Sequence, residues 1–274
     1  MSYFSHKYFN TYYYANIISN ILSQDIELIG FISNFFSDAE MIYELAIPFQ
    51  KDSAFHCLIK YMIGEFFEND MDDYDQIVFK SGDLHRNPAG LLYVERALME
   101  YGLDDYLFKD FVIDKPLTNY SVVEAYRDDL ILTGRLEELY DKIANEVFYI
   151  MFNNREALLQ FNFIVASHMD VDIGEVDDIQ KRRLFNRQGH LKRVRIPDWC
   201  KKAVFFRDRG KCCLCQKDLS GTLRIDSGKQ FDHIVPLAKG GLNDVSNIQL
   251  LCSACNNKKN KHEIITSQAY ESWY

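Results

Sequence analysis

Apolar side chains recur at helical spacing through most of the first 180 residues. Large aliphatic residues return every three or four positions, as at Ile18, Ile21 and Leu22, and polar residues fill the positions between them. Glycine and proline, which interrupt helices, are sparse in this stretch. We predict helices over residues 53–67, 88–101, 121–132, 135–152 and 155–168, and a further helix capped by Ser37 and Asp38.

The pattern changes in residues 180–274, where short apolar runs alternate with loops. Residues 231–237 predict a strand that carries an acid and an imidazole, Asp232 and His233. A glycine pair at 240 and 241 predicts a flexible loop, and the apolar run 248–251 leads to a helix that opens near Cys252. The expected fold is a mainly α N-terminal domain plus a small α+β C-terminal domain.

The net charge changes sign near residue 180, where the hydrophobic pattern also changes. Residues 1–179 hold 12 basic and 32 acidic residues, whereas residues 180–274 hold 19 basic and 8 acidic residues. The net charge of −9 therefore hides a basic C-terminal part. A length of 274 residues suits two domains. We expect an acidic helical domain at 1–179 and a basic domain at 180–274, with the boundary between the acidic stretch 170–178 and the basic stretch 181–195.

Two pairs of cysteines, each with two residues between its members, lie in the basic part. Cys212 and Cys215 form the first pair, and Cys252 and Cys255 form the second. Each pair closes a tight turn, and four thiolates around one centre make the closed tetrahedral site that suits structural Zn²⁺. Cys213 offers a second register for the first pair, but it would make a poorer chelate turn with Cys215. The spacing predicts a zinc centre.

Two alternatives to zinc remain open for these cysteines. Free cysteines often lie in protein cores, as we expect for Cys57 and Cys200, and the paired cysteines could be ordinary buried thiols. Two disulfides would need an oxidising compartment, and the chain opens without the basic start and apolar run of a signal peptide. The paired spacing and this start favour zinc and a cytoplasmic location.

An acid, a histidine and two asparagines follow the first cysteine pair in a fixed order. Asp232 and His233 come first, Asn247 lies 14 positions after the histidine, and Asn256 lies 9 positions after Asn247. Together with the cysteine pairs, these residues resemble the HNH endonuclease family over residues 196–262. The resemblance implies a zinc-stapled ββα-metal fold for the C-terminal domain.

The resemblance also implies a role for each side chain. His233 would be the general base that deprotonates the attacking water, and Asn247 would hydrogen-bond the ring of His233 and orient it. Asp232 and Asn256 would hold one divalent ion against the scissile phosphate. Asn260, four residues further along the same helix, is a further candidate ligand. Oxygen donors suit a hard ion, so we expect Mg²⁺, or Mn²⁺ in its place.

Basic residues flank the predicted zinc centre in the sequence. If they neutralise phosphates, nucleic-acid binding should fall steeply with added salt. The candidates are Lys201, Lys202, Arg207 and Arg209 before the first cysteine pair, and Lys258 and Lys259 on the following helix. No base-reading motif accompanies them, so weak sequence preference is expected.

These features predict a metal-dependent endonuclease that hydrolyses phosphodiester bonds in DNA, with RNA as an alternative substrate. The acidic helical domain matches no motif. We expect it to sense a trigger or to dock a protein partner or a second copy, as would suit an effector of phage defence or restriction. Two other hypotheses are a catalytically inactive nucleic-acid-binding adaptor or regulator, and an acidic half that inhibits the basic half by charge mimicry. No uncharged apolar run reaches the roughly 20 residues of a membrane-spanning helix.

Overall fold

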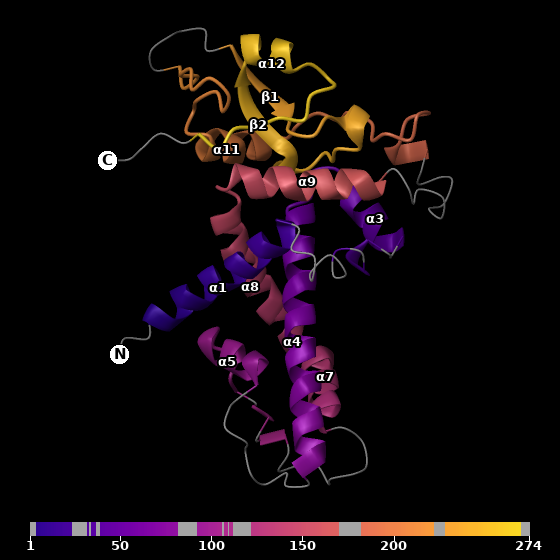
Figure 1. The fold of residues 1–274 in the computed structure, drawn as a ribbon, viewed down its shortest axis with the longest axis vertical. Coiled ribbons are helices and arrows are strands. Elements are labelled where there is room, and N and C mark those ends of the chain that lie inside the picture. The colour runs from indigo at the N-terminus through magenta and orange to yellow at the C-terminus, as the bar shows by residue number, and fades with distance from the viewer. Residues whose placement is uncertain are drawn as a thin grey trace. The chain divides into compact units, whose positions relative to one another are not determined.

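The computed structural model describes residues 4–23, 32, 34–36, 39–81, 92–105, 107–108, 110–111, 122–169, 182–221 and 228–269. Helices form most of the N-terminal part, and a small antiparallel sheet with short helices forms the C-terminal part (Figure 1). The elements in chain order are α1 (Phe4–Leu22), α3 (Ala39–Ala46), α4 (Ala54–Ser81), α5 (Tyr93–Glu100), α7 (Val122–Leu132), α8 (Arg135–Met151), α9 (Arg155–Met169), α11 (Asp198–Arg207), β1 (Lys229–His233), the 3-10 turns η3 (Leu237–Lys239) and η4 (Val245–Asn247), β2 (Ile248–Cys252) and α12 (Ser253–Lys259). The predicted fold class is confirmed.

The helices predicted from hydrophobic spacing are present, with differences at their ends. Helices α8 and α9 begin where predicted, at Arg135 and Arg155. Helix α4 continues past its predicted end at residue 67 to Ser81, because no glycine or proline occurs between residues 65 and 81. The predicted caps and starts at Ser37, Asp38, Pro88 and Ser121 lie outside the described residues.

The chain packs into two compact units, each built from segments that are far apart in the sequence. The first unit contains residues 1–16 and 59–147, and the second contains residues 17–58 and 148–274. The second unit therefore holds the whole sheet together with α3 and α9. This division differs from the predicted domains, whose boundary near residue 179 stays a prediction.

Aromatic rings and one shared carboxylate hold the first unit together. The rings of Phe67 and Tyr140 stack with their centroids 6.1 Å apart. Thr11 and Tyr101 each donate a 2.9 Å hydrogen bond to the carboxylate of Glu146. Burial and the charge of Glu146 raise the pKa of Tyr101 well above its usual value, so its hydroxyl stays a donor. Glu146 of α8 thus pairs with Thr11 of α1 and with Tyr101 inside this unit.

Two antiparallel strands lie at the centre of the second unit. Asp232 lies opposite Gln249 and His233 lies opposite Ile248, so the acid and the imidazole end β1. Helices α11 and α12 both pack against β2, and α9 packs along η4 (Figure 1). Every residue of β2 is buried, because helices cover this strand. Four of its five residues are apolar, and the fifth, Gln249, is buried with its side chain hydrogen-bonded to Cys213 and to the carbonyl of Ile265.

A buried ionic cluster connects α9 and α11 to the sheet. The Oδ1 atom of Asp208 accepts hydrogen bonds from Arg207 at 2.9 Å and from Arg155 at 3.3 Å. The Oδ2 atom of Asp208 accepts the backbone N–H of Leu250 at 2.8 Å, and Arg207 donates to the carbonyl of Ile248 at 2.7 Å. These three charged side chains are at most 3% exposed. The cluster therefore links α9 and the end of α11 to β2 through buried charged side chains.

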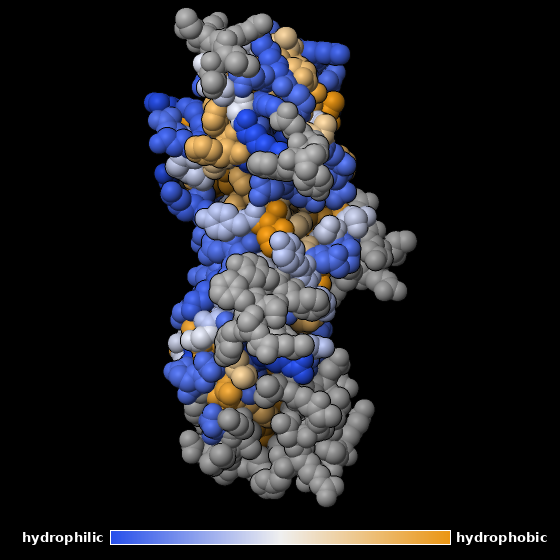
Figure 2. Space-filling view, turned by 90° about the vertical axis from the view of Figure 1, so that its left-hand side faces the viewer, coloured by the Kyte–Doolittle hydropathy of each residue, from blue (hydrophilic) through white to orange (hydrophobic). Residues whose placement is uncertain are grey.

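One face of the molecule is predominantly polar where the structure describes it (Figure 2). Figure 2 shows one face, on which hydrophilic side chains predominate and hydrophobic side chains appear in small groups. Phe206 and Tyr149 are the most exposed of the described aromatic side chains, at 74% and 72%. Among the described helices, none is long and apolar enough to cross a membrane.

Candidate active site and metal centre

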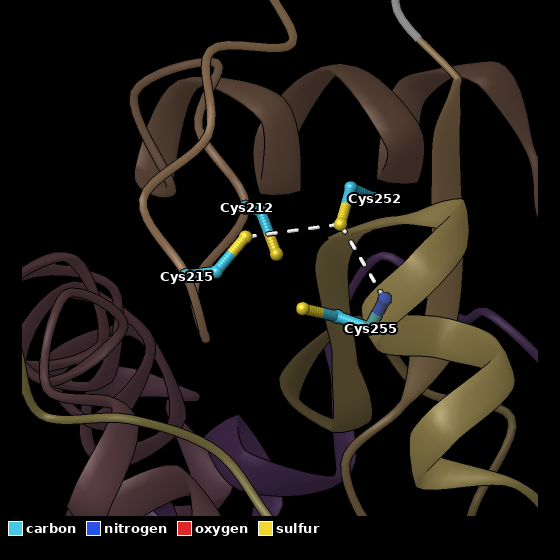
Figure 3. Close-up of side chains that lie close together, drawn as sticks. All are labelled: Cys212, Cys215, Cys252 and Cys255. Carbon is cyan, nitrogen blue, oxygen red and sulfur yellow. Dashed lines mark hydrogen bonds between the residues drawn. The ribbon is translucent and has the colours of Figure 1, made fainter.

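Four cysteine sulfurs converge beside the sheet (Figure 3). Cys212 and Cys215 lie in the turn after α11, Cys252 ends β2, and Cys255 lies in the first turn of α12. Their Sγ atoms all lie within 4.8 Å of one another, and those of Cys215 and Cys252 are 3.8 Å apart. A tetrahedral zinc centre with bonds of about 2.3 Å has edges of about 3.8 Å. The predicted cluster is confirmed, and it is compatible with structural zinc.

Backbone hydrogen bonds shape both halves of the cysteine cluster. The turn of the first pair is closed by hydrogen bonds from Cys212 N to Lys217 O at 2.9 Å and from Gln216 N to Cys212 O at 2.8 Å. Cys252 caps α12, because its Sγ accepts the backbone N–H of Cys255 at 3.4 Å. Burial acts to raise the pKa of Cys252, but hydrogen bonds from the Cys255 amide and from neighbouring thiols lower it to about 7. Such a thiol readily supplies a thiolate ligand.

Cys213 lies outside the cluster, which decides the register of the first pair. Its side chain is buried, and its Sγ donates a hydrogen bond to Gln249 Oε1 at 3.0 Å. Burial raises the pKa of Cys213 to about 12, so it remains a neutral thiol. The spacing that joins Cys212 to Cys215 is therefore the one the fold uses.

His233 is held in a buried position at the end of β1. The side chain is 1% exposed, and its Nε2 lies 3.3 Å from Asn243 Oδ1. Its Nδ1 atom is buried and has no hydrogen-bond partner among the described residues. Burial, assisted by the positive charge of Arg193, lowers the pKa of His233 to about 4. The ring is therefore neutral near pH 7 and keeps one nitrogen able to accept a proton.

Asn247 braces the loop between the strands instead of contacting the imidazole. Its Oδ1 accepts the N–H of Val235 at 2.8 Å, and its Nδ2 donates to the carbonyls of Val235 and Leu242, each at 2.9 Å. The predicted hydrogen bond from Asn247 to His233 is therefore wrong. Asn243 takes that place, because the loop curls back and brings an earlier asparagine to the ring.

Lys259 faces inward from α12. Its side chain is 1% exposed, its Nζ donates to the carbonyl of His233 at 2.8 Å, and it lies 3.0 Å from Asp232 Oδ2. The predicted phosphate contact of Lys259 does not fit this position, because a buried ammonium cannot reach a nucleic-acid backbone. Lys259 instead ties α12 to the end of β1 and lies against the predicted metal ligand Asp232.

The two candidate amide ligands occupy different settings. Asn256 is half-buried on α12, the helix that packs against β1. Asn260 ends the helix, with φ of 50°, and its Oδ1 accepts the N–H of His262 at 2.7 Å. The prediction that Asn260 shares a helical face with Asn256 is therefore wrong, because α12 stops at Lys259. Asp232 and Asn256 remain the candidate oxygen donors.

Exposed basic side chains remain around the site. Lys202, Arg209 and Lys258 are exposed, and Lys201 is half-buried with its Nζ 3.1 Å from the carboxylate of Asp198. Arg207 was predicted to bind nucleic acid, but its side chain is fully buried in the ionic cluster with Asp208. The helical face of α11 that packs on β2 carries Arg207, and this packing removes it from the surface.

Asn243 is the site residue that the sequence reasoning missed. Its Nδ2 donates to the carbonyl of Lys192 at 2.9 Å while its Oδ1 faces the ring of His233. The residue lies four positions before Asn247, and both are buried. Nothing in the local pattern distinguishes which of the two asparagines reaches the ring.

Residues 212–262 match the family model described as HNH endonuclease. The match includes both cysteine pairs and the predicted acid, histidine and asparagines, and it spans less than half of the chain. The C-terminal part therefore carries an HNH segment, and the resemblance inferred from the sequence is confirmed there. Comparisons with curated proteins and with solved structures gave no significant match.

Proposed function

We propose that this protein is a divalent-metal-dependent HNH endonuclease that hydrolyses phosphodiester bonds in DNA. The observation that carries the proposal is the neutral, buried imidazole of His233, whose Nδ1 has no partner in the part of the chain that the structure describes, beside the carboxylate of Asp232 in an HNH segment. A positioned imidazole next to an acid that can bind a metal ion supplies a general base and a metal ligand, two groups that can catalyse phosphodiester hydrolysis.

His233 acts as the general base in this proposal. The Nδ1 atom accepts a proton from the attacking water, the new P–O bond forms, and the P–O3′ bond breaks. The 3′ oxygen leaves and takes a proton from solvent. The low pKa of His233 keeps the ring unprotonated before attack, and its carbonyl bond to Lys259 fixes the strand end that carries it.

The donor set at the end of β1 fits a hard divalent ion such as Mg²⁺ or Mn²⁺. Asp232 Oδ2 is buried, and among the described residues its partner is the ammonium of Lys259, whose Nζ lies 3.0 Å away. A carboxylate offers about four lone-pair positions, so the lysine leaves room for a ligand bond. Asp232 and Asn256 would hold the ion, which when bound would stabilise charge on the phosphate and on the leaving oxygen.

The basic part of the chain supports a nucleic-acid partner. Residues 180–274 carry 19 basic against 8 acidic residues, and Lys202, Arg209 and Lys258 are exposed. These charges can neutralise phosphates without reading bases. We therefore propose DNA binding of weak sequence preference, with RNA as the alternative substrate.

Cleavage of supercoiled plasmid tests this function. We expect nicking or linearisation with Mg²⁺ or Mn²⁺ and none with EDTA. His233→Ala should abolish cleavage while keeping DNA binding, because it removes the base and no exposed charge. His190→Ala is the matched control, since His190 lies in the same domain without an assigned role, and it should cleave like the wild type. DNA binding without cleavage under every metal condition would instead support the adaptor or regulator.

We also propose that the helical part gates this nuclease, as an effector of phage defence or restriction would require. The 1% exposure of His233 supports gating, because substrate can reach the ring only after a local opening. Cleavage by the full chain should then rise when its trigger is present, and infection of cells that carry the gene offers a direct assay. Equal protection by wild type and His233→Ala would contradict this role.

A further inference from the structure

The loop between the strands is held by segments from the N-terminal part of the chain. Phe49 N donates to Asn243 O at 2.8 Å, and Ala54 N donates to Asp244 Oδ2 at 3.0 Å. Asn162 on α9 donates to the hydroxyl of Ser246 at 3.3 Å. All of these residues belong to the second compact unit. The loop that carries two site asparagines is therefore fixed from outside the HNH segment.

The side chain of Asp244 hydrogen-bonds both to this loop and to the start of α4. Its Oδ1 accepts from the N–H of Ser246 at 2.8 Å and from the hydroxyl of Ser246 at 2.6 Å, which caps η4. Its Oδ2 accepts from Ala54, the first residue of α4. A carboxylate is favoured at a helix N-terminus, where the first N–H groups lack partners inside the helix. The buried side chain of Asp244 thus caps η4 and also accepts the first backbone N–H of α4.

Helix α9 approaches the other side of the same loop. Gly240 has φ of 82°, and a Cβ placed there would lie 2.7 Å from the carbonyl oxygen of Ala166 in α9. The glycine pair was predicted to give a flexible loop. Instead, Gly240 permits a backbone contact too close for any side chain, so α9 restrains the loop.

Asn243 connects the restrained loop to the ring of His233. Its backbone carbonyl is held by Phe49, and its Nδ2 donates to the carbonyl of Lys192. Because the amide nitrogen is used in this way, the Oδ1 atom is the one that faces the ring. An oxygen acceptor at Nε2 places the imidazole proton there, which leaves the lone pair on Nδ1.

We propose that residues 49–54 and α9 are a built-in part of the nuclease site, and that they position Asn243 so that it holds His233 with Nδ1 toward the attacking water. Asn243 is a positioning residue, and Asp244 fixes it through the backbone. This inference rests on the proposed function. The helical part of the chain then serves catalysis itself, in addition to any regulation.

Two substitutions in the full chain test the connection. Asn243→Ala removes the acceptor at the ring. Ala54→Pro removes only the N–H that reaches Asp244, since proline is tolerated at the first position of a helix. Ala54→Gly keeps that N–H and is the matched control. We expect Asn243→Ala to lower kcat by about 10- to 100-fold and Ala54→Pro by about 10-fold, because misplaced catalytic groups cost rate. KM, DNA affinity and zinc content should stay unchanged.

The double variant separates positioning from simple destabilisation. If Ala54→Pro acts through Asn243, the double variant should be no slower than Asn243→Ala alone, within about twofold. Multiplied losses, or an Ala54→Pro variant that cleaves like Ala54→Gly, would overturn the proposal.

A spectroscopic readout keeps the inference independent of cleavage. Imidazole ¹⁵N shifts of His233 in the full chain should report a proton on Nε2 in the wild type and in Ala54→Gly, and a mixture of tautomers in Ala54→Pro and Asn243→Ala. Unchanged shifts in both variants would overturn the positioning role. A wild-type chain with these shifts but no cleavage would overturn only the proposed nuclease function.

Discussion

Two adjacent lysines on α12 show how burial assigns different roles to the same side chain. Lys258 is exposed, whereas the Lys259 side chain is 1% exposed and holds both the carbonyl of His233 and the carboxylate of Asp232. An exposed lysine can neutralise a phosphate, and a buried one stabilises the partners it satisfies. We therefore expect Lys258 to affect nucleic-acid binding and Lys259 to affect folding.

The same substitution at each lysine should change a different property, DNA affinity at Lys258 and stability at Lys259. Lys258→Met should weaken DNA binding and reduce the slope of log affinity against log salt by about 0.9, with no change in unfolding. Lys259→Met keeps the apolar stem but leaves Asp232 and a carbonyl without their donor, and it should cost about 1–3 kcal/mol of stability. Salt-dependent binding isotherms and denaturant unfolding measure the two effects. Equal loss of affinity in both variants would contradict the inward role of Lys259.

Site chemistry at this scale was only partly predictable from the sequence. Motif order predicts the acid, the histidine and Asn256 as site residues, but it does not show which of Asn243 and Asn247 contacts the ring of His233. Both are buried asparagines near the same loop, and the curl of that loop decides which one meets the ring.

At the scale of elements, the cysteine cluster joins the turn after α11 to the start of α12. Cys255→Ser should lose zinc, unfold the start of α12 and displace Asn256 with it, because folding and metal binding are coupled at such a centre. Metal content per chain and thermal unfolding measure this. Cys213→Ser is the control, since a hydroxyl can keep the hydrogen bond to Gln249 and the residue lies outside the cluster. A zinc-replete Cys255→Ser with normal cleavage would refute the structural centre.

The ionic cluster joins α9 and α11 to β2, and it offers a second test of how elements hold together. Asp208→Ala would leave Arg155 and Arg207 buried without their shared carboxylate, and it should destabilise the protein by about 3–5 kcal/mol. Asp198→Ala removes an exposed partner of Lys201 and should leave unfolding unchanged. Chemical denaturation measures the free energy of unfolding of both variants. Similar values would mean that the ionic cluster does not stabilise the fold.

At the scale of the whole molecule, each of the two compact units is built from segments that are not consecutive in the chain. Residues 17–58 and 148–169 pack in the unit that contains the HNH segment. The opposed charges of the two halves, with 32 acidic residues in 1–179 and 19 basic residues in 180–274, still allow the acidic half to act as an inhibitor.

Truncation distinguishes a nuclease that needs the N-terminal segments to fold from one that the acidic half inhibits. Residues 180–274 alone lack Phe49, Ala54, Arg155 and Asn162, so the strand loop and Asp208 lose their outside contacts. We expect this fragment to show no cooperative thermal transition and no metal-dependent cleavage. A fragment that cuts faster than the full chain would instead establish charge-mimicry inhibition.

Features that depend on local spacing could be predicted from the sequence. Paired cysteines, helical periodicity and the order of acid, histidine and asparagine predicted the cysteine cluster, the helices and the HNH segment. Only the tertiary structure decided that Lys259 and Arg207 are buried, that Asn243 meets His233, and that α9 belongs with the sheet. These outcomes depend on contacts between residues up to 190 positions apart, such as Ala54 and Asp244, which no local pattern encodes.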